Sequence, residues 1–166
     1  MPYAAECYNR LRCNFVLVAY RGYSNSDGVP SEKGLMRDGH AIMQEVQNMK
    51  DIDTNQIFVH GRSLGGAVAT YVTTSRPYNI SGVIIENSFT SISAMVDKIF
   101  PGVAFLKSMV LRNFWPSDQR VAKMEFPVLF IKAENDEIVP PEHMDILYDL
   151  CQSKKKEKVF FLICEQ

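Results

Sequence analysis

Apolar residues in this chain fall either into short continuous runs or into stretches with helical spacing. Short continuous runs are typical of strands that are covered on both faces, because no position along such a strand has to meet water. Five runs predict strands, over residues 15–20, 56–60, 82–86, 126–131 and 159–163. Because buried parallel strands need crossover connections, helices are expected between them.

Three of the intervening segments carry helix signals. Apolar positions recur at helical spacing over residues 35–49, after a start signal at Ser31. Further helices are expected over 64–75 and over 140–151, the latter opening with prolines, which favour a first helical turn. Strands alternating with helices predict a doubly wound, mostly parallel α/β sheet, in a single domain over residues 1–166.

Residues 100–118 fit neither pattern. They mix aromatic residues, proline and glycine without a clean period, and their apolar side chains include Phe105, Leu106 and Trp115. This segment is interpreted as a cap or lid inserted over an acyl-binding site, with ordinary core packing as the alternative.

Composition narrows the class of protein. The 166 residues suffice for one domain with a hydrophobic core, and 18 basic against 19 acidic side chains leave a net charge of −1, so nucleic-acid binding is not indicated. No apolar run is long enough to span a bilayer and the N-terminus lacks a signal-peptide pattern, so an intracellular, soluble protein is expected. The cysteines form no C-x-x-C pair, and neither a metal nor an organic cofactor is implied.

The segment FVHGRSLGGAVA, residues 58–69, places a serine in a setting typical of a nucleophile. Ser63 lies in a G-x-S-x-G sequence between an expected strand and an expected helix, which is the arrangement of a nucleophile elbow. In such a turn the serine backbone is strained, and Gly61 and Gly65 are expected to let the strand and the helix approach each other. The N–H of Leu64, at the start of the helix, is expected to stabilise an oxyanion.

The acid of a catalytic triad is expected after a later strand, since triads of this kind follow the chain order serine, acid, histidine. Glu134 and Asp136 both follow the strand expected over 126–131. The alternative is an aspartate that only caps the helix near Pro140.

Four segments, YRGYSNSDG, GRSLGGAVA, ENSF and PVLFIKAENDEIVPPEHMDILYDL, occur here in the order found in α/β-hydrolases. Over residues 14–150 the chain resembles this superfamily, and the nearest group is the α/β-hydrolase domain-containing protein 13 type, related to prolyl-oligopeptidase-like serine hydrolases. The resemblance implies a nucleophile at Ser63 and selects Asp136 as the acid. It also implies hydrolysis of carboxylic esters or acyl-thioesters, protein depalmitoylation among them, on a small-molecule or acylated-protein substrate. Full-length relatives are expected to be membrane-associated.

Two parts of the resembled fold have no counterpart in this sequence. The chain is expected to begin inside the helix after the third strand, so that the first three strands and a His-Gly loop donating the second oxyanion N–H are missing. The family's histidine would follow the strand expected over 159–163, where the sequence reads Cys164-Glu165-Gln166. His40, His60 and His143 remain as candidates for the base, and His143 is the least implausible because it lies nearest the acid in sequence.

The sequence is therefore compatible with three functions. The first is a serine hydrolase whose Ser-His-Asp triad lacks an evident histidine. The second is a catalytically inactive fragment or truncated isoform that keeps only the scaffold, because loss of a triad member costs about 10⁴-fold in rate. The third is a phosphate- or nucleotide-binding α/β domain that uses the helix after Ser63 as an anion site. It is disfavoured because the phosphate-binding glycine patterns are absent.

Overall fold

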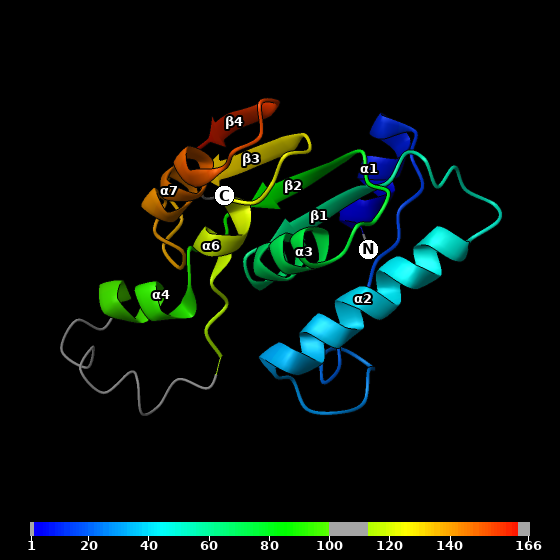
Figure 1. Ribbon diagram of the computed structural model, residues 1–166, viewed down its shortest axis with the longest axis horizontal. Helices are drawn as coiled ribbons and strands as arrows, with labels where there is room; N and C mark the ends of the chain where they lie inside the picture. Colours follow the sequence, from blue (N-terminus) through cyan, green and yellow to red (C-terminus); the bar gives the residue numbers. More distant parts are fainter. Residues whose placement is uncertain (1, 100–112, 163–166) are drawn as a thin grey trace.

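The structure, a computed structural model, describes residues 2–99 and 113–162. Helices and strands alternate along these residues, as the sequence predicts (Figure 1). The strands are β1 (Phe58–Arg62), β2 (Gly82–Glu86), β3 (Val128–Ala133) and β4 (Lys156–Phe161). The helices are α1 (Pro2–Leu11), α2 (Glu32–Asn48), α3 (Leu64–Ser75), α4 (Ile92–Ile99), α6 (Ser117–Val121) and α7 (Glu142–Leu150).

The four strands form one parallel sheet in the order β1-β2-β3-β4. The register places Arg62 beside Glu86, and Glu86 beside Ile131. All arrowheads point the same way in Figure 1, so the carboxyl ends of the strands lie along one edge of the sheet, where sites form in open parallel sheets. The predicted fold class is confirmed.

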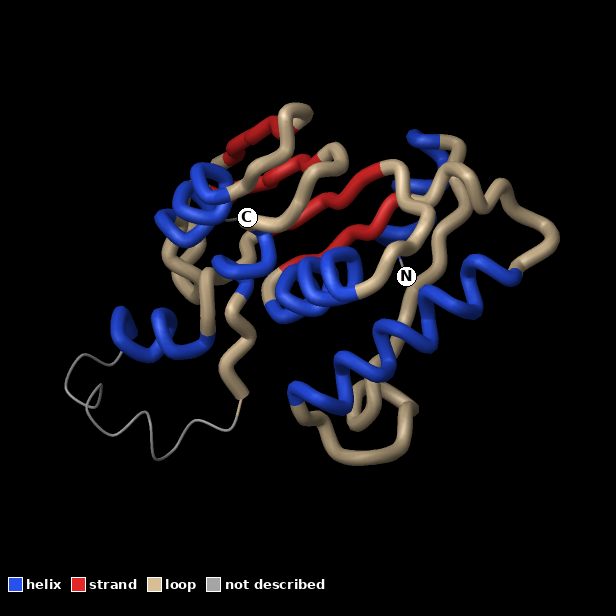
Figure 2. Tube along the Cα trace, viewed as in Figure 1, coloured by secondary structure: helices blue, strands red, loops and turns tan. Residues whose placement is uncertain are grey.

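Helices pack on this sheet through α3 and α7. Helix α3 contacts β1 and β2, α7 contacts β3, and α2 packs against α3 (Figure 2). The two helices α2 and α3 approach closely at Gly39, where a Cβ would lie 2.5 Å from Val72 Cγ2 and 3.2 Å from Val68 Cγ1. Ala69 of α3 packs with buried side chains of β2 and β3, Phe130 among them, in the core beneath the sheet.

Four of the five predicted strands are confirmed, the one over 82–86 with the same bounds and three with adjusted bounds, and the helix predicted over 64–75 is found as α3. The strand predicted over residues 15–20 is wrong, because these residues form no strand. Val16, Leu17 and Val18 are 46%, 53% and 42% exposed. A strand needs a ladder partner, and within the described residues β1, at one edge of the sheet, pairs only with β2.

The cap or lid predicted over residues 100–118 lies mostly outside the described residues, which omit 100–112. The described part is tied to the start of α2. The N–H groups of Phe114 and Trp115 donate to the Glu32 carboxylate over 2.6 and 3.2 Å, and Trp115 is almost fully buried. Trp115 therefore belongs to the packed body of the domain.

Candidate active site

Ser63 forms the one-residue turn between β1 and α3. Its φ of 52° and ψ of −122° lie outside the regions that residues with a Cβ prefer. Such a backbone costs on the order of 1–3 kcal/mol and persists only where the surrounding structure holds it in place. The backbone strain that the sequence predicts at this serine is present.

Two glycines let β1 and α3 meet this closely. A Cβ on Gly61 would overlap the backbone of Gly65, and a Cβ on Gly66 would lie 2.6 Å from the side chain of Ser88. A Cβ on Gly65, in contrast, would meet nothing within 4 Å. The prediction that Gly65 is needed for the close approach is therefore wrong, whereas Gly66 contributes to it, because its Cβ would also lie 3.2 Å from the Gly61 carbonyl oxygen.

Residues at the end of β2 hold the turn by hydrogen bonds. The Ser63 N–H donates to the Glu86 carbonyl over 3.0 Å, and Ser88 Oγ–H donates to the Ser63 carbonyl over 2.9 Å. The Gly66 N–H donates to that same carbonyl over 2.9 Å. Ser88 is fully buried, so solvent does not compete for its hydroxyl. These bonds fix both ends of the strained peptide.

The Glu86 carboxylate joins two side chains of β1 that precede Ser63. His60 Nε2–H donates to Glu86 Oε2 over 2.9 Å, and Arg62 Nε lies 3.6 Å from Oε1. The His60 hydrogen bond holds the pKa of the Glu86 carboxyl below its usual value, although partial burial acts in the opposite direction. His60, one of the candidate bases, is therefore engaged with Glu86.

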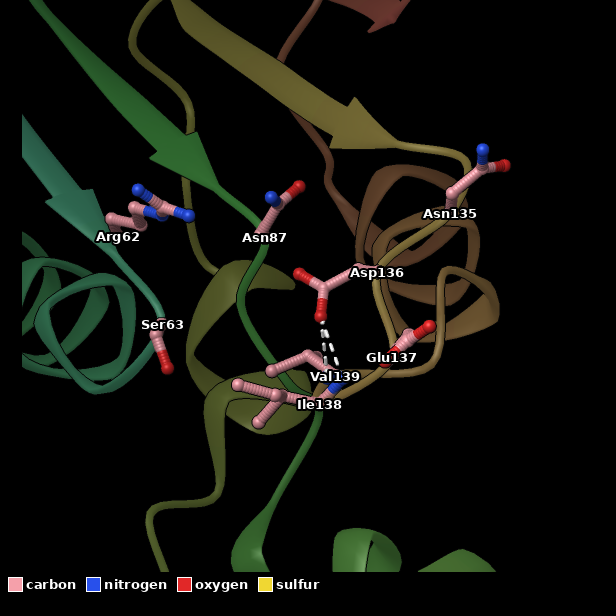
Figure 3. Close-up of a pocket in the computed structure, with 8 residues that line it drawn as sticks. All are labelled: Arg62, Ser63, Asn87, Asn135, Asp136, Glu137, Ile138 and Val139. Carbon is pink, nitrogen blue, oxygen red and sulfur yellow. Dashed lines mark hydrogen bonds between the residues drawn. The ribbon is translucent and has the colours of Figure 1, made fainter. Parts of the chain in front are cut away.

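Ser63 and Asp136 line one pocket of about 860 Å³ at the carboxyl edge of the sheet (Figure 3). Asp136 lies in the loop after β3. Its Oδ1 accepts hydrogen bonds from the N–H groups of Ile138 and Val139 over 2.9 and 2.8 Å. Its other oxygen points into the pocket and accepts no hydrogen bond from a described residue. The remaining lining residues are Arg62, Asn87, Asn135, Glu137, Ile138 and Val139.

Neither alternative to Asp136 as the acid, Glu134 or a helix-capping role for Asp136, agrees with the structure. Glu134 Oε2 lies 3.2 Å from Lys132 Nζ, and Glu134 does not line the pocket. Asp136 does not cap α7, because that helix begins at Glu142 and the carboxylate bonds the loop before it. Of the two acids considered, the one selected by resemblance is the one that shares a pocket with Ser63.

Leu64 is the first residue of α3, so its N–H precedes the hydrogen-bond ladder of the helix. Within the described residues this N–H donates to no other group. It is therefore available beside Ser63, and its part as an oxyanion donor stays a prediction.

The three histidines of the sequence all bond elsewhere. His143 is 5% exposed, and its Nδ1 lies 2.9 Å from Oγ1 of Thr90. His40 Nδ1 lies 2.7 Å from the hydroxyl of Tyr78. Together with the His60 bond to Glu86, these contacts bring no histidine of this chain into hydrogen-bond contact with Ser63 or Asp136. Nor do the described residues include a group of three His, Cys, Asp or Glu side chains that could hold a metal ion.

Asn87 is a pocket residue that sequence reasoning missed. It is 3% exposed and has a φ of 42°. Its Oδ1 accepts a hydrogen bond from the Ala133 N–H over 2.7 Å, while its Nδ2 has no partner among the described residues. Asn87 lies within the segment ENSF that supports the resemblance, but its role could not be predicted there, because its contacts depend on strands meeting side by side.

Comparisons with known proteins show which family this sequence resembles. The family model described as serine aminopeptidase, S33 matches residues 13–120. The α/β-hydrolase domain-containing protein WAV2 of Arabidopsis thaliana is 38% identical over 162 residues, which cover 91% of this chain and 53% of that protein. Protein bem46 of Schizosaccharomyces pombe is 38% identical over 165 residues, covering 99% and 55%. The chain thus spans about half the length of the curated relatives it matches.

A further relative, YNL320W of Saccharomyces cerevisiae, is named an uncharacterized membrane protein and is 38% identical over 157 residues, covering 92% of this chain and 54% of that protein. In the part of this chain that the structure describes, no helix combines the length and the apolar character needed to cross a membrane.

Solved structures show the same fold at low sequence identity. An α/β-hydrolase from Vibrio vulnificus has a TM-score of 0.65 at 24% identity, covering 86% of this chain and 53% of that one. Acetyl xylan esterase 1 from Thermoanaerobacterium has a TM-score of 0.65 at 17% identity, covering 89% and 60%. A monoacylglycerol lipase from Paleococcus ferrophilus has a TM-score of 0.58 at 17% identity, covering 87% and 70%.

Proposed function

Because the chain belongs to the serine aminopeptidase S33 family of the α/β-hydrolase superfamily, we propose that it carries the nucleophile and the acid of a serine hydrolase. The bond cleaved is a carboxylic ester or an acyl-thioester, in a small molecule or in an acylated protein, and protein depalmitoylation falls within this class. The observation that supports the proposal most is that the strained Ser63 shares a pocket with Asp136. The names of two structural neighbours, an esterase and a lipase, are consistent with ester cleavage.

The chemistry follows from the groups at the pocket. Ser63 Oγ attacks the substrate carbonyl carbon while a base takes the hydroxyl proton, and the carbonyl oxygen becomes an oxyanion that accepts the Leu64 N–H. The oxyanion collapses, the C–O or C–S bond breaks, and the base returns the proton to the leaving alcohol or thiol. Water then attacks the acyl-serine in the same way and releases the acid. Asp136 orients the base and stabilises its charge through the oxygen that faces the pocket.

The base determines how active this chain is by itself. No histidine of the chain hydrogen-bonds Ser63 or Asp136, and loss of a triad member costs about 10⁴-fold in rate. This observation favours the second candidate function, a scaffold that does not catalyse. The two candidates differ in one respect: if Ser63 is a nucleophile, imidazole supplied in solution can serve as its base within the pocket.

The first prediction is that imidazole accelerates hydrolysis of p-nitrophenyl butanoate through Ser63. In the unaltered chain, a saturating imidazole-dependent rate is expected to exceed that of Ser63→Ala by about 10²-fold, the lower range for a positioned base. Release of p-nitrophenol is followed by absorbance. Ser24→Ala is the matched control, because Ser24 also has a positive φ, of 51°, but does not line the pocket.

Ser63→Ala also corrects for the reaction of imidazole with the ester in solution. Equal imidazole-dependent rates for the unaltered chain and Ser63→Ala would contradict the serine hydrolase and support the scaffold.

A further inference from the structure

A buried amide donor without an acceptor lies in the wall of the candidate site. Asn87 is 3% exposed and lines the pocket, and its Nδ2 has no hydrogen-bond partner among the described residues (Figure 3). A buried donor left without an acceptor costs free energy, and such groups are rare in folded proteins. A molecule that brings an acceptor into this pocket recovers that cost.

The direction of the Asn87 amide is fixed by its neighbour. Its oxygen accepts the Ala133 backbone N–H over 2.7 Å, and because a backbone N–H can only donate, the oxygen and nitrogen cannot be exchanged. The φ of 42° belongs to the left-handed region, which asparagine and aspartate tolerate better than most residues. The backbone and Oδ1 of Asn87 are thus both fixed, and only its Nδ2 lacks a hydrogen-bond partner among the described residues.

Asn87 lies on the side of Ser63 where the leaving group of a substrate belongs. Its N–H donates to the Ile131 carbonyl of β3, and the residue before it accepts the Ser63 N–H, so Asn87 stands between the ends of β1 and β3. The loop after β3 carries Asp136. A base that serves both Ser63 and Asp136 occupies this same side, and that base hands its proton to the leaving group.

Charge at the pocket selects a neutral acceptor. Asp136 and Glu137 line the pocket and form no ion pair within the described residues, so an anion would be repelled. The one basic lining side chain, Arg62, lies 3.6 Å from the Glu86 carboxylate. A neutral carbonyl oxygen can accept from Asn87 without meeting this repulsion.

We propose that Asn87 Nδ2 binds a neutral carbonyl oxygen on the leaving group, so that the site favours esters and thioesters whose leaving group carries an amide. This proposal rests on the proposed function, because the side of Ser63 on which the leaving group lies follows from the proposed catalytic mechanism. The nitrogen is buried as well as unpartnered, so an acceptor from the ligand would compete with neither bulk water nor another described residue.

The test compares two thioesters of equal leaving-group length on the Ser63→Ala chain, which cannot form an acyl-serine. S-butanoyl-N-acetylcysteamine carries the amide carbonyl, and S-pentyl thiobutanoate lacks it. We expect the first to bind about threefold to tenfold more tightly, as one neutral hydrogen bond allows, although the second is more apolar. The side-chain amide signal of Asn87 in ¹⁵N-labelled protein, assigned by its loss in Asn87→Asp, should shift with the first ligand only.

Asn87→Asp keeps an acceptor for Ala133 and tolerates the positive φ, but it removes the donor. It is expected to abolish the preference between the two thioesters. Asn135→Asp is the matched control, because Asn135 is an exposed amide of the same pocket and the change in charge is the same. This control should keep the preference.

Equal affinity for both thioesters, an unmoved Asn87 signal, or the same loss in Asn135→Asp would overturn the proposal. Equal affinity for the two thioesters would overturn the proposal even if Asn87→Asp fails to fold. Since this binding is measured without turnover, a preference found while Ser63 proves unreactive would retain the inference about Asn87 and remove only the proposed catalysis.

Discussion

At the scale of single residues, the turn at Ser63 depends on two glycines and on the buried hydroxyl of Ser88. Gly61 and Gly66 allow the sharp turn, while Ser88 occupies the space beside Gly66 and bonds the Ser63 carbonyl. The strained φ of Ser63 is thus imposed by its neighbours, as stored strain requires. Gly65 belongs to the sequence motif but is not needed for this packing.

This difference predicts opposite results for two neighbouring alanine substitutions. Gly66→Ala should destabilise the domain by about 1–3 kcal/mol, because the new methyl group would be forced against Ser88. Gly65→Ala should leave stability unchanged or raise it by up to about 1 kcal/mol, because alanine is the better helix former. Urea unfolding followed by circular dichroism measures both. Equal losses for the two variants would show that the packing described at this turn is incorrect.

Local sequence patterns predicted Ser63 and Leu64 as site residues and left Glu134 and Asp136 open as the acid, and the family resemblance selected Asp136. The segment ENSF contains Asn87 and Ser88, but it assigned neither of them a role. The hydrogen bonds of these two residues reach partners 46 and 25 positions away. Such pairings depend on strand register, which local patterning does not specify.

At the scale of elements, pairing between strands explains what sequence patterning captured and what it missed. The strand predicted to end at His60 continues through Arg62, because β2 offers partners as far as Glu86. Residues 15–20 have a strong strand pattern and yet form no strand, because within the described residues no ladder reaches them. An apolar pattern indicates a tendency to form a strand, but the strand forms only where a neighbouring strand pairs with it.

The contact between His60 on β1 and Glu86 on β2 predicts how stability varies with pH. Since the pKa of the folded Glu86 carboxyl is lowered, its contribution is present at neutral pH and is lost as pH falls through the acidic range. Glu86→Gln should therefore lower the free energy of unfolding by about 1–2 kcal/mol at pH 7 and by much less near pH 3. Urea unfolding across this range provides the measurement.

The matched control is Glu125→Gln, which changes an exposed glutamate outside the strands. A loss in Glu86→Gln that is the same at pH 3 and pH 7 would show that the carboxylate charge does not contribute to the pairing of β1 with β2.

At the scale of the whole molecule, the parallel sheet is what brings the nucleophile and the acid together. Ser63 follows β1 and Asp136 follows β3, and since both strands end at the same edge, the two side chains share one pocket although they are far apart in sequence. His40, His60 and His143 hydrogen-bond Tyr78, Glu86 and Thr90 instead of either pocket side chain. Ser63 is therefore expected to be the reactive residue, at a rate that depends on a base.

The most direct test of this central claim is covalent labelling with a fluorophosphonate in the presence of imidazole, followed by peptide mapping in a mass spectrometer. We expect the adduct to form on Ser63 and not on Ser24, which has nearly the same φ but lies outside the pocket, and labelling to slow when imidazole is withdrawn. An unmodified Ser63, or an equal yield on Ser24, would contradict this claim.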